Sequence, residues 1–335
     1  MNQATSPAPR PRAGVAMCVY NGARYLRTQL ESIVAQEELP LRMVVVDDGS
    51  TDGSWELLQE WSASAPFPVA LERNAQNLGV VRNFEKAARL LLAEVDVIFF
   101  SDQDDQWYPG KLAAFVDAFV ADPRLGLVHS DADLVDMEGQ PLGSRLLAAL
   151  LVTEREREEV ASGHAYRTYI RRNLVTGAAC ACRTSMLAQA LPFSDRMIHD
   201  EWIAFVASVV APVRMIEQPL MAYRLHGANT VGLPIPSRIW WWRSVFKALL
   251  EPQVPRQQQR FARLQEMRAH ALQLGAHADV LACLDLAIAH AQHRCSLSRN
   301  PLRRALAVCA QWRDGQYRRW SSSRMSMLHD LLLAN

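Results

Sequence analysis

The sequence predicts an α/β protein in which helices cover both faces of a mostly parallel β-sheet. In the first half of the chain, short apolar runs alternate with segments whose apolar residues recur at helical spacing. Repeated strand–loop–helix units of this kind are typical of parallel strands joined by crossover helices. With 335 residues, of which 50% are hydrophobic, the chain is long enough for a large core and for two domains.

Four strands and three helices are predicted before residue 101. The last strand is a run of four apolar residues, as expected for a central strand that is buried on both faces. Helical spacing covers residues 25–36, 55–61 and 84–92, and the second of these helices is expected to begin at a Ser or Asp cap. The strands are expected at residues 15–19, 41–46, 69–71 and 97–100.

The second half of the first domain is expected to add two strands and an apolar helix. The strands are predicted at 125–129 and 215–216, the second followed by a turn at Pro219, and the helix at 202–209. Residues 153–160 carry charges of alternating sign, which is typical of an exposed helix face or a mobile loop.

Pro234 and Pro236 mark a boundary between a first domain at 13–235 and a helical region at 236–335. Within that region, residues 237–250 combine three tryptophans with cations. This composition suits an interfacial helix at a membrane surface, and it equally suits a helix that packs its aromatic rings on the first domain. Three more amphipathic helices are predicted near 258–274, 278–293 and 301–312.

Composition excludes several classes of protein. The net charge of +1 gives no argument for nucleic-acid binding. The six cysteines show no metal-binding spacing, so we expect reduced thiols in a cytoplasmic protein. The first twelve residues are polar and proline-rich, unlike a signal peptide, and no apolar run is long enough to span a membrane.

Three carboxylates follow the central strand within four positions, at Asp102, Asp104 and Asp105. Like charges this close repel one another and raise one another's pKa, and a divalent cation relieves that repulsion. Asp102 and Asp104 point the same way on an extended segment, so they can hold Mg²⁺ or Mn²⁺ while a diphosphate supplies further oxygens. An isolated Asp-x-Asp can also be a simple polar turn, and that is our expectation for Asp131-Ala132-Asp133.

The other polar clusters support the metal-site interpretation because each of them also follows a predicted strand. In parallel sheets, ligands bind outside the carboxyl ends of the strands. No glycine-rich nucleotide-binding or phosphate-binding motif occurs, so we expect the cation and basic side chains to handle phosphate. The clusters are Asn21, Asp47-Asp48, Asn77 and Asp102–Asp105.

Six short motifs, in this order, resemble those of the family 2 glycosyltransferases, which have the GT-A fold. The resemblance covers residues 13–232 and is closest to the bacterial rhamnosyltransferase-like branch of the family. The motifs are Val19-Tyr20-Asn21-Gly22, Val45-Val46-Asp47-Asp48-Gly49-Ser50-Thr51-Asp52, Asn77-Leu78-Gly79, Ser101-Asp102-Gln103-Asp104-Asp105, His199-Asp200-Glu201-Trp202 and Tyr223-Arg224-Leu225-His226-Gly227-Ala228-Asn229.

The resemblance implies a metal-dependent, inverting hexosyltransferase. Its donor would be a nucleotide-diphosphate sugar carrying dTDP or UDP, such as dTDP-rhamnose, and its cofactor Mg²⁺ or Mn²⁺. Its acceptor would be a saccharide or a lipid-linked saccharide in the synthesis of a cell-surface polysaccharide such as O-antigen. A cytoplasmic enzyme with peripheral contact to the inner face of the membrane, and with no nucleic-acid partner, would suit that acceptor.

The resemblance also assigns residues to the donor and the cation. It places the base-binding carboxylate at Asp47, preferred here to Asp48, for which a turn or cap role with Ser50 stays open. Asp104 is the expected metal ligand, with Asp102 beside the ribose and the cation, and Asp105 as a second ligand or an acceptor contact. The remaining donor or metal contacts are expected from Tyr20, Asn21, Asn77, Arg224 and His226, with Arg224 clamping the diphosphate.

Asp200 is the candidate general base. An acceptor hydroxyl must lose its proton as it attacks the anomeric carbon, and a carboxylate within hydrogen-bond reach can take it. Asp200 precedes an apolar helix, so it can also be an N-cap. Glu201 is the alternative base, His199 is a candidate for orienting the acceptor, and the region of Gly177 is expected to form the floor beneath the sugar.

Three other classes of function are compatible with parts of this pattern. A nucleotidyltransferase would be expected to carry a glycine-rich, basic loop after the first strand, and Tyr20-Asn21-Gly22 does not resemble one. A phosphatase that uses Asp-x-Asp as nucleophile would be followed by Thr or Val, whereas Asp105 and Gln106 follow here. A non-catalytic sugar-nucleotide-binding protein would have no need of both Asp104 and Asp200.

Overall fold

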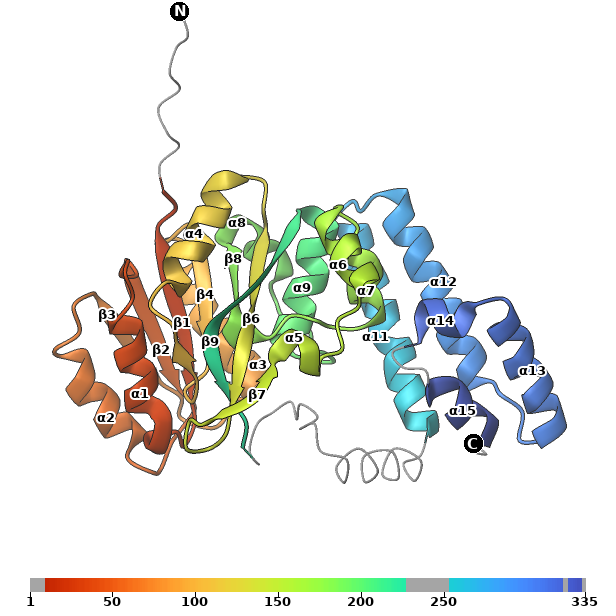
Figure 1. The fold of residues 1–335 in the computed structure, drawn as a ribbon, viewed down its shortest axis with the longest axis horizontal. Helices are drawn as coiled ribbons and strands as arrows, with labels where there is room; N and C mark the ends of the chain where they lie inside the picture. The colour runs from red at the N-terminus through yellow and green to blue at the C-terminus, as the bar shows by residue number, and fades with distance from the viewer. Residues whose placement is uncertain (1–9, 227–252, 322–324, 333–335) are drawn as a thin grey trace, which may run out of the picture.

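A computed structural model describes residues 10–226, 253–321 and 325–332 (Figure 1). Its centre is one nine-stranded sheet with the order β3-β2-β1-β4-β8-β6-β9-β5, and β7 pairs with β6 beside this path. The strands are β1 (Ala13–Val19), β2 (Arg42–Asp47), β3 (Val69–Arg73), β4 (Val97–Ser101), β5 (Gln106–Trp107), β6 (Leu127–Val135), β7 (Pro141–Arg145), β8 (Cys180–Arg183) and β9 (Val213–Arg224).

Within the described residues the sheet is mixed: six of its nine strands run in one direction, as predicted for a mostly parallel sheet, but β5, β7 and β8 run in the other, so only half of the pairings are parallel. Strands β1 to β4 pair in parallel, and β6 pairs in parallel with β9. Strand β8 lies antiparallel between β4 and β6, so β4 and β6 run in the same direction. The carboxyl ends of β1, β2 and β4 therefore meet at one edge of the sheet, which is where the polar clusters were expected to converge.

Helices cover both faces of the sheet, which confirms the predicted fold class. One face packs against α1 (Ala23–Val34), α2 (Ser54–Ser62) and α4 (Lys111–Ala121). The other packs against α3 (Val80–Leu91), α7 (Ala165–Arg171), α8 (Thr184–Ala190) and α9 (His199–Val210). In β1, Val15 and Met17 face the first group of helices and Ala16 and Cys18 face the second, so the whole strand is buried.

Two short helices, α5 (Leu146–Ala149) and α6 (Glu154–Ala161), follow β7. Helix α6 accounts for the charged segment 153–160, and it begins at a capping box formed by Thr153 and Glu156. This segment is more than an exposed charged face, because Glu156 is buried and forms ion pairs with Arg171 and Arg172.

Two strands extend beyond the ranges that the sequence predicts. Strand β6 continues to Val135, so Asp131 and Asp133 lie inside a strand and the expected loop role is wrong. Strand β9 has 12 residues and runs through Pro219, where a turn was expected. Pairing with β6 is irregular at this point, and a bulge is where a strand tolerates a residue that has no N–H.

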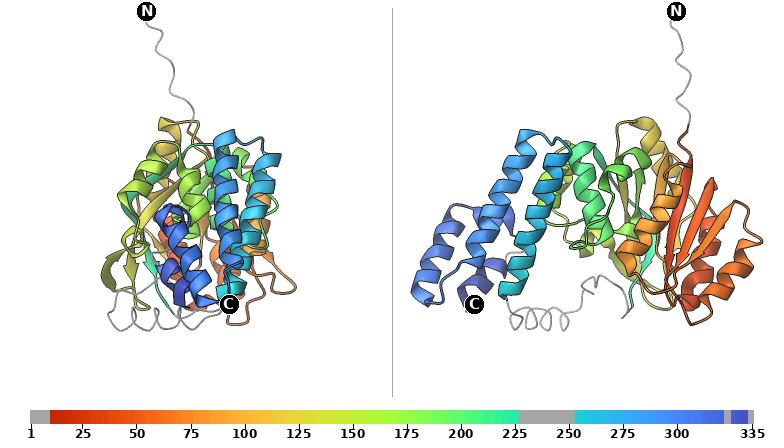
Figure 2. Two further views of the ribbon diagram at one scale, coloured as in Figure 1. Left: turned by 90° about the vertical axis from the view of Figure 1, so that its right-hand side faces the viewer. Right: turned by 180° about the vertical axis from the view of Figure 1, so that it is seen from behind.

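The C-terminal helices divide into two groups (Figure 2). Helices α11 (Gln253–Gln273) and α12 (Ala278–Cys295) pack on α7 and α9 and share the core on that face of the sheet. Beyond them, α13 (Pro301–Arg313), α14 (Gln316–Trp320) and α15 (Met325–Leu332) surround a smaller cluster that contains Leu297, Val308 and Tyr317.

The tryptophan-rich segment 237–250 lies outside the described residues, as does the predicted boundary at 235. None of the helices in the described ranges combines the length and the hydropathy that a membrane span requires.

Candidate active site

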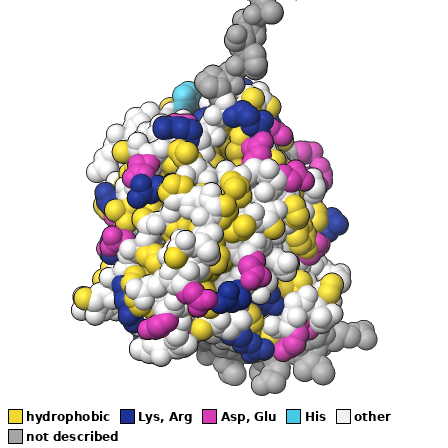
Figure 3. Space-filling view, turned by 90° about the vertical axis from the view of Figure 1, so that its left-hand side faces the viewer, with side chains coloured by type: hydrophobic (Ala, Val, Ile, Leu, Met, Phe, Trp, Pro, Cys, Tyr) yellow, Lys and Arg dark blue, Asp and Glu magenta, His cyan; other side chains and the backbone are white. Residues whose placement is uncertain are grey.

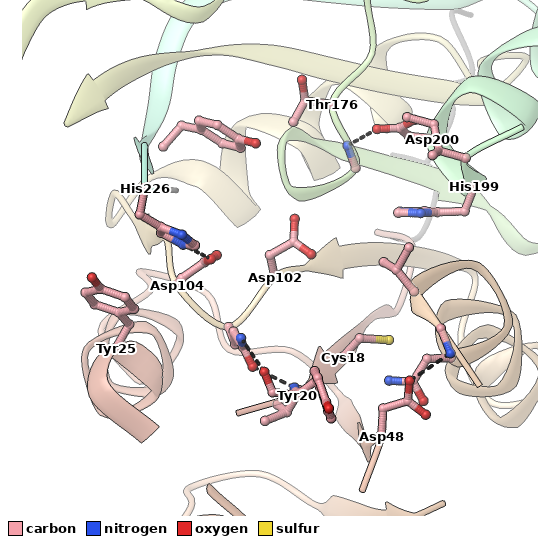
Figure 4. A pocket seen from close by; sticks show the side chains of 18 of the residues that line it. Cys18, Tyr20, Tyr25, Asp48, Asp102, Asp104, Thr176, His199, Asp200 and His226 are labelled. Atoms are coloured by element: carbon pink, nitrogen blue, oxygen red, sulfur yellow. Dashed lines mark hydrogen bonds and ion pairs between the residues drawn. The ribbon is translucent and has the colours of Figure 1, made fainter. Parts of the chain in front are cut away.

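A cavity of about 970 Å³ opens at the carboxyl ends of β1, β2 and β4 (Figure 4). The loops that follow these strands and β3 form one side of it, and residues 173–177 with the start of α9 form the other. Most of the predicted site residues line this cavity, whereas Asp47, Asp105 and Arg224 do not. The predicted residues that line it are Tyr20, Asn21, Asp48, Asn77, Asp102, Asp104, Asp200 and His226.

Asp48 ties the end of β2 to the loop after β3. Its carboxylate accepts the backbone N–H groups of Leu78 at 2.8 Å and Gly79 at 2.9 Å, and the side-chain amide of Asn74 at 2.7 Å. Asn77, in the same loop, also lines the cavity. Asp48 thus presents a buried carboxylate to the cavity, and part of its capacity to accept hydrogen bonds is already used.

Asp47 points away from the cavity. It is the last residue of β2, and its side chain lies on the same face of the sheet as Val45, among the residues that pack on α1 and α2. Its Oδ2 accepts the N–H of Ser50 at 3.0 Å and lies 3.3 Å from Nε of Arg73. The preference for Asp47 over Asp48 as the base-binding residue therefore disagrees with the geometry, because adjacent strand residues face opposite ways.

Gln103 holds the loop after β4 against the loop after β1. Its Oε1 accepts the N–H of Tyr20 at 2.8 Å, and its Nε2 donates to the carbonyl of Tyr20 at 3.0 Å. A Cβ at Gly22 would stand 2.2 Å from Oε1 of Gln103, so the close contact requires glycine at this position. Sequence reasoning gave Gln103 no role, although its place between two aspartates was a signal.

Arg224 supports the same loop from the opposite side. Its backbone N–H donates to Asp105 at 3.0 Å, and its Nε donates to the carbonyl of Asp104 at 2.8 Å. The guanidinium also donates to the carbonyl of Asp136 and lies over the ring of Tyr25. These contacts fix the acidic loop, and they differ from the expected diphosphate clamp.

Lys111 is a fully buried cation beneath the cavity that sequence reasoning missed. Its Nζ donates to the carbonyl of Ala178 at 2.5 Å and lies 4.1 Å from the centroid of the Trp107 ring. Burial lowers the pKa of this amine to about 7, while the charge of Asp105 acts in the opposite direction. A lysine at the start of a helix is normally solvent-exposed, so nothing in the local sequence indicated this role.

The carboxylates in the cavity repel one another. Burial, together with the charges of Asp104 and Asp200, raises the pKa of Asp102 to about 7, and Lys111 opposes this rise. Burial, together with the charges of Asp104 and Asp102, also raises the pKa of Asp105 well above its usual range. Figure 4 shows Asp102 pointing into the space between Asp104 and Asp200. This excess of negative charge favours a bound cation.

Asp104 and His226 meet at the mouth of the cavity. Oδ2 of Asp104 lies 2.6 Å from Nε2 of His226, and the imidazole stacks on Tyr25 with 5.6 Å between ring centroids. A carboxylate and an imidazole are ligands that suit Mn²⁺, and a carboxylate suits Mg²⁺. No cluster of three or more metal-binding side chains exists within the described ranges, so these residues fit a cation whose remaining ligands come from a bound diphosphate.

Asp200 lies in the first turn of α9, opposite the acidic loop. Its carboxylate accepts the N–H of Gly177 at 2.9 Å and the side-chain amide of Asn173 at 3.1 Å. The N-cap of α9 is Ile198, so the capping role considered for Asp200 is wrong. Burial raises the pKa of Asp200 to about 7, and its two hydrogen bonds oppose that rise. A carboxyl group with this pKa can accept a proton near neutral pH.

His199 and Glu201 differ from Asp200 in their surroundings. The His199 ring lines the cavity, stacks on Phe84 at 4.2 Å, and has neither nitrogen hydrogen-bonded within the described structure. Burial lowers its pKa to about 3, so the imidazole is neutral. Glu201, the alternative base, pairs with Arg263 on α11 and does not line the cavity.

A family model described as "Glycosyl transferase family 2" matches residues 14–160. This part of the chain is a family 2 glycosyltransferase domain. The family that the motifs indicated is thereby confirmed, and the matched range contains the loops of the cavity from Tyr20 to Asp104.

Characterised and uncharacterised relatives agree with this assignment. A glycosyltransferase of Nostoc sp. whose function is not characterised is 27% identical over 232 residues, which are 65% of this chain and 66% of that protein. The dTDP-rhamnosyl transferase RfbG of Shigella flexneri is 32% identical over 106 residues, or 31% of this chain and 37% of that protein. The matches thus span just under two thirds of the first relative and little more than a third of the second.

The architecture resembles that of solved glycosyltransferases. The mannosyltransferase PcManGT of Pyrobaculum calidifontis, solved with GDP-mannose and Mn²⁺, superposes with a TM-score of 0.51 at 21% identity. The superposition covers 98% of this chain and 88% of that one. At this level of identity the likeness concerns the fold, and it agrees with the GT-A architecture that the motifs implied.

Proposed function

We propose that this protein is a metal-dependent, inverting glycosyltransferase that moves a hexose from a nucleotide-diphosphate donor to a saccharide or a lipid-linked saccharide. The observation that carries the proposal is the composition of one cavity. On one side the Asp104–His226 pair offers ligands for a cation, and on the other Asp200 presents a buried carboxylate with a pKa of about 7. A reaction that moves a sugar from a diphosphate leaving group to a hydroxyl nucleophile needs both.

The donor base is proposed to lie at Asp48, between Tyr20, Asn21 and Asn77. A carboxylate has about four lone-pair positions, and Asp48 uses three of them for Asn74, Leu78 and Gly79. One position is left to accept the ring N–H of uracil or thymine. Asp48 is thus proposed for the base-binding role that was expected of Asp47. Asp102 is proposed to bind the ribose.

A divalent cation, Mg²⁺ or Mn²⁺, would be held by Asp104 and His226 and would neutralise charge on the leaving diphosphate. The chain keeps these ligands in place through two supports. Gln103 holds the acidic loop to Tyr20 by a hydrogen bond, and Arg224 donates a hydrogen bond to the carbonyl of Asp104 in the same loop. The positive charge of the cation would also stabilise the ionised form of Asp102, whose pKa is raised.

Asp200 is proposed to remove the proton of the acceptor hydroxyl. Its hydrogen bonds to Gly177 and Asn173 orient the carboxylate, and the neutral imidazole of His199 beside it is available to orient the acceptor. The base and the leaving diphosphate approach the sugar from opposite faces, because Asp200 and the Asp104–His226 pair lie on opposite sides of the cavity. The configuration at the anomeric carbon therefore inverts.

The donor sugar is proposed to be rhamnose carried by dTDP, with UDP-sugars as the next candidates. The motifs are closest to the rhamnosyltransferase-like branch, and the Shigella relative is named a dTDP-rhamnosyl transferase. We place the reaction in the synthesis of a cell-surface polysaccharide, on the cytoplasmic side of the membrane. All six cysteines are free thiols, as expected of a protein in a reducing compartment.

A ligand screen followed by a rate measurement tests this function. Nucleotide sugars carrying dTDP, UDP or GDP are added with Mn²⁺, with Mg²⁺ or with a chelator, and the melting temperature is recorded. We expect one donor to raise the melting temperature in the presence of metal, and that donor to be hydrolysed slowly without an acceptor. A protein that binds a donor but never releases sugar would be a binding protein, and stabilisation by no donor would contradict the proposal.

A further inference from the structure

Helix α13 exposes an apolar stripe to solvent while its opposite side packs on the C-terminal cluster. Val308 is fully buried in that cluster. Leu302 is 76% exposed, Leu306 73% and Trp312 61%. These three side chains, with the exposed Cys309 between them, fall on one side of the helix by its 3.6-residue periodicity. Large apolar side chains that gather on a surface, surrounded by polar ones, mark an interaction site.

Arginines are frequent in the same part of the chain. From Ser296 to Trp320 the sequence has six arginines and a single acid, Asp314. Arg304 turns inward and is buried. The others are exposed on α13, on the loop before it and on α14; they are Arg299, Arg303, Arg313, Arg318 and Arg319. The exposed side of α13, with Leu302, Leu306, Cys309 and Trp312, is called the α13 face below, and these five arginines are its nearest exposed cations along the chain.

The opposite end of the molecule has a different surface. Acidic and basic side chains are interspersed there among apolar ones, with no region of a single sign (Figure 3). Interspersed charges are what a surface in contact with water normally carries. The α13 face departs from this pattern in two ways at once, because its exposed side chains are apolar and the charged residues of the surrounding sequence are almost all arginines, with Asp314 beside Arg313 as the exception.

We propose that the α13 face binds an anionic phospholipid surface. Leucine and tryptophan side chains at the level of the headgroups, with arginines on the lipid phosphates, are the composition of an interfacial helix. A second copy of this chain fits less well, since a symmetric contact through α13 would bring the two sets of arginines together. The proposal concerns a surface away from the cavity, and it does not depend on the transferase activity.

Vesicle co-sedimentation of the full chain tests this surface. We expect the parent protein to bind vesicles of phosphatidylcholine with phosphatidylglycerol, to bind phosphatidylcholine alone poorly, and to lose affinity as salt screens the arginines. The double variant Leu302→Glu with Leu306→Glu should lower the partition coefficient by about tenfold or more. Both leucines are exposed, so the variant should melt at the temperature of the parent.

A matched control separates the α13 face from exposed leucines in general. Leu41 is 48% exposed and lies in the first domain, before β2. Leu41→Glu should leave vesicle binding unchanged. A fluorophore attached to Cys309, the exposed thiol on the face, should shift its emission to shorter wavelength with anionic vesicles and not with neutral ones.

Four results would overturn the proposal. The parent protein can fail to bind anionic vesicles at low salt, or the double glutamate variant can bind them as the parent does. Release from vesicles by Trp240→Ala with Trp241→Ala, but not by the α13 variant, would place the contact in residues 237–250 instead. A concentration-dependent dimer in sedimentation velocity that the α13 variant abolishes, without vesicle binding by the parent, would assign the face to a second copy.

Discussion

Two Asp-x-Asp sequences follow one another in the same sheet, and they have opposite surroundings. Asp102-Gln103-Asp104 lies just beyond the end of β4, where the chain turns along the cavity. Asp131-Ala132-Asp133 lies inside β6, which runs in the same direction as β4. The residue types and the spacing are identical, so the difference between the two pairs comes from where their strands end.

Hydrogen bonds and charge distinguish the two pairs as clearly as position does. Asp131 accepts the backbone N–H groups of Leu147 and Ala132, both at 2.9 Å, and Asp133 accepts the hydroxyl of Tyr108 at 2.9 Å. For Asp102, by contrast, burial and the neighbouring carboxylates Asp104 and Asp200 raise the pKa to about 7. The first pair lies in an excess of negative charge that a bound cation would neutralise, whereas the side chains of the second pair are hydrogen-bonded within the protein.

The largest effect is expected at Asp200, which completes the site opposite the first pair. Asp200→Asn keeps the shape of the side chain but removes the base, so transfer to the acceptor should fall by about 100-fold or more. Donor and metal binding, measured by calorimetry, should stay within about twofold of the parent. Asn in place of Glu201, which pairs with Arg263, should lower the rate of transfer much less. Near-normal transfer by the Asp200 variant would show that Asp200 is not the base.

The pH dependence of transfer is the next largest effect. The raised pKa of Asp200 means that the carboxyl is protonated, and unable to act as a base, in acidic solution. The rate constant kcat/KM should therefore rise about tenfold per pH unit up to about 7 and level off above it. The residual activity of Asp200→Asn should lack this step. A profile of the parent enzyme that is flat between pH 5 and 8 would contradict the role of Asp200.

Substitution of one carboxylate in each Asp-x-Asp pair tests whether the position of the pair decides its role. Asp104→Asn should weaken donor binding in the presence of Mn²⁺ by about tenfold or more, because loss of a ligand costs at least as much as loss of a residue that orients one. Asp133→Asn is the matched control, and it should bind the donor as the parent does. Equal losses in both variants, or in neither, would mean that the position of the pair does not decide its role.

The free energy of unfolding should depend on the second pair and not on the first. Asp131→Ala leaves the buried N–H of Leu147 without its acceptor, so the free energy of unfolding should fall by about 1–3 kcal/mol in urea denaturation. The rate of transfer by the folded variant should stay unchanged. Asp104→Asn should leave the free energy of unfolding unchanged or slightly raised, because it removes one of several repelling charges.

The fold and most of the cavity could be predicted because they follow from local patterns. Apolar runs and helical spacing located β1, β2 and β4, and the rule that ligands bind at the carboxyl ends of parallel strands brought Asp48, Asp104 and Asn77 together. The sequence could not show that Asp48 rather than Asp47 lines the cavity, because this depends on which side of β2 each residue faces. A shift of one residue in the end of a strand reverses that answer.

Contacts between distant segments could not be predicted. Arg224 holds the acidic loop from β9, which was predicted to end before Pro219 but continues beyond it through irregular pairing with β6. Lys111 carries no local sign of its burial, because its partners Ala178 and Asp105 come from other elements. Such roles depend on tertiary packing, which a single sequence does not display.

The most direct test of the central claim is the anomeric configuration of the product. A donor of known configuration is converted by the parent enzyme, and the linkage in the product is assigned from its anomeric NMR couplings. A single displacement, with Asp200 as base and the diphosphate leaving from the opposite face, predicts inversion. Retention of configuration cannot arise from a single displacement from the opposite face, so it would contradict the account given for Asp200.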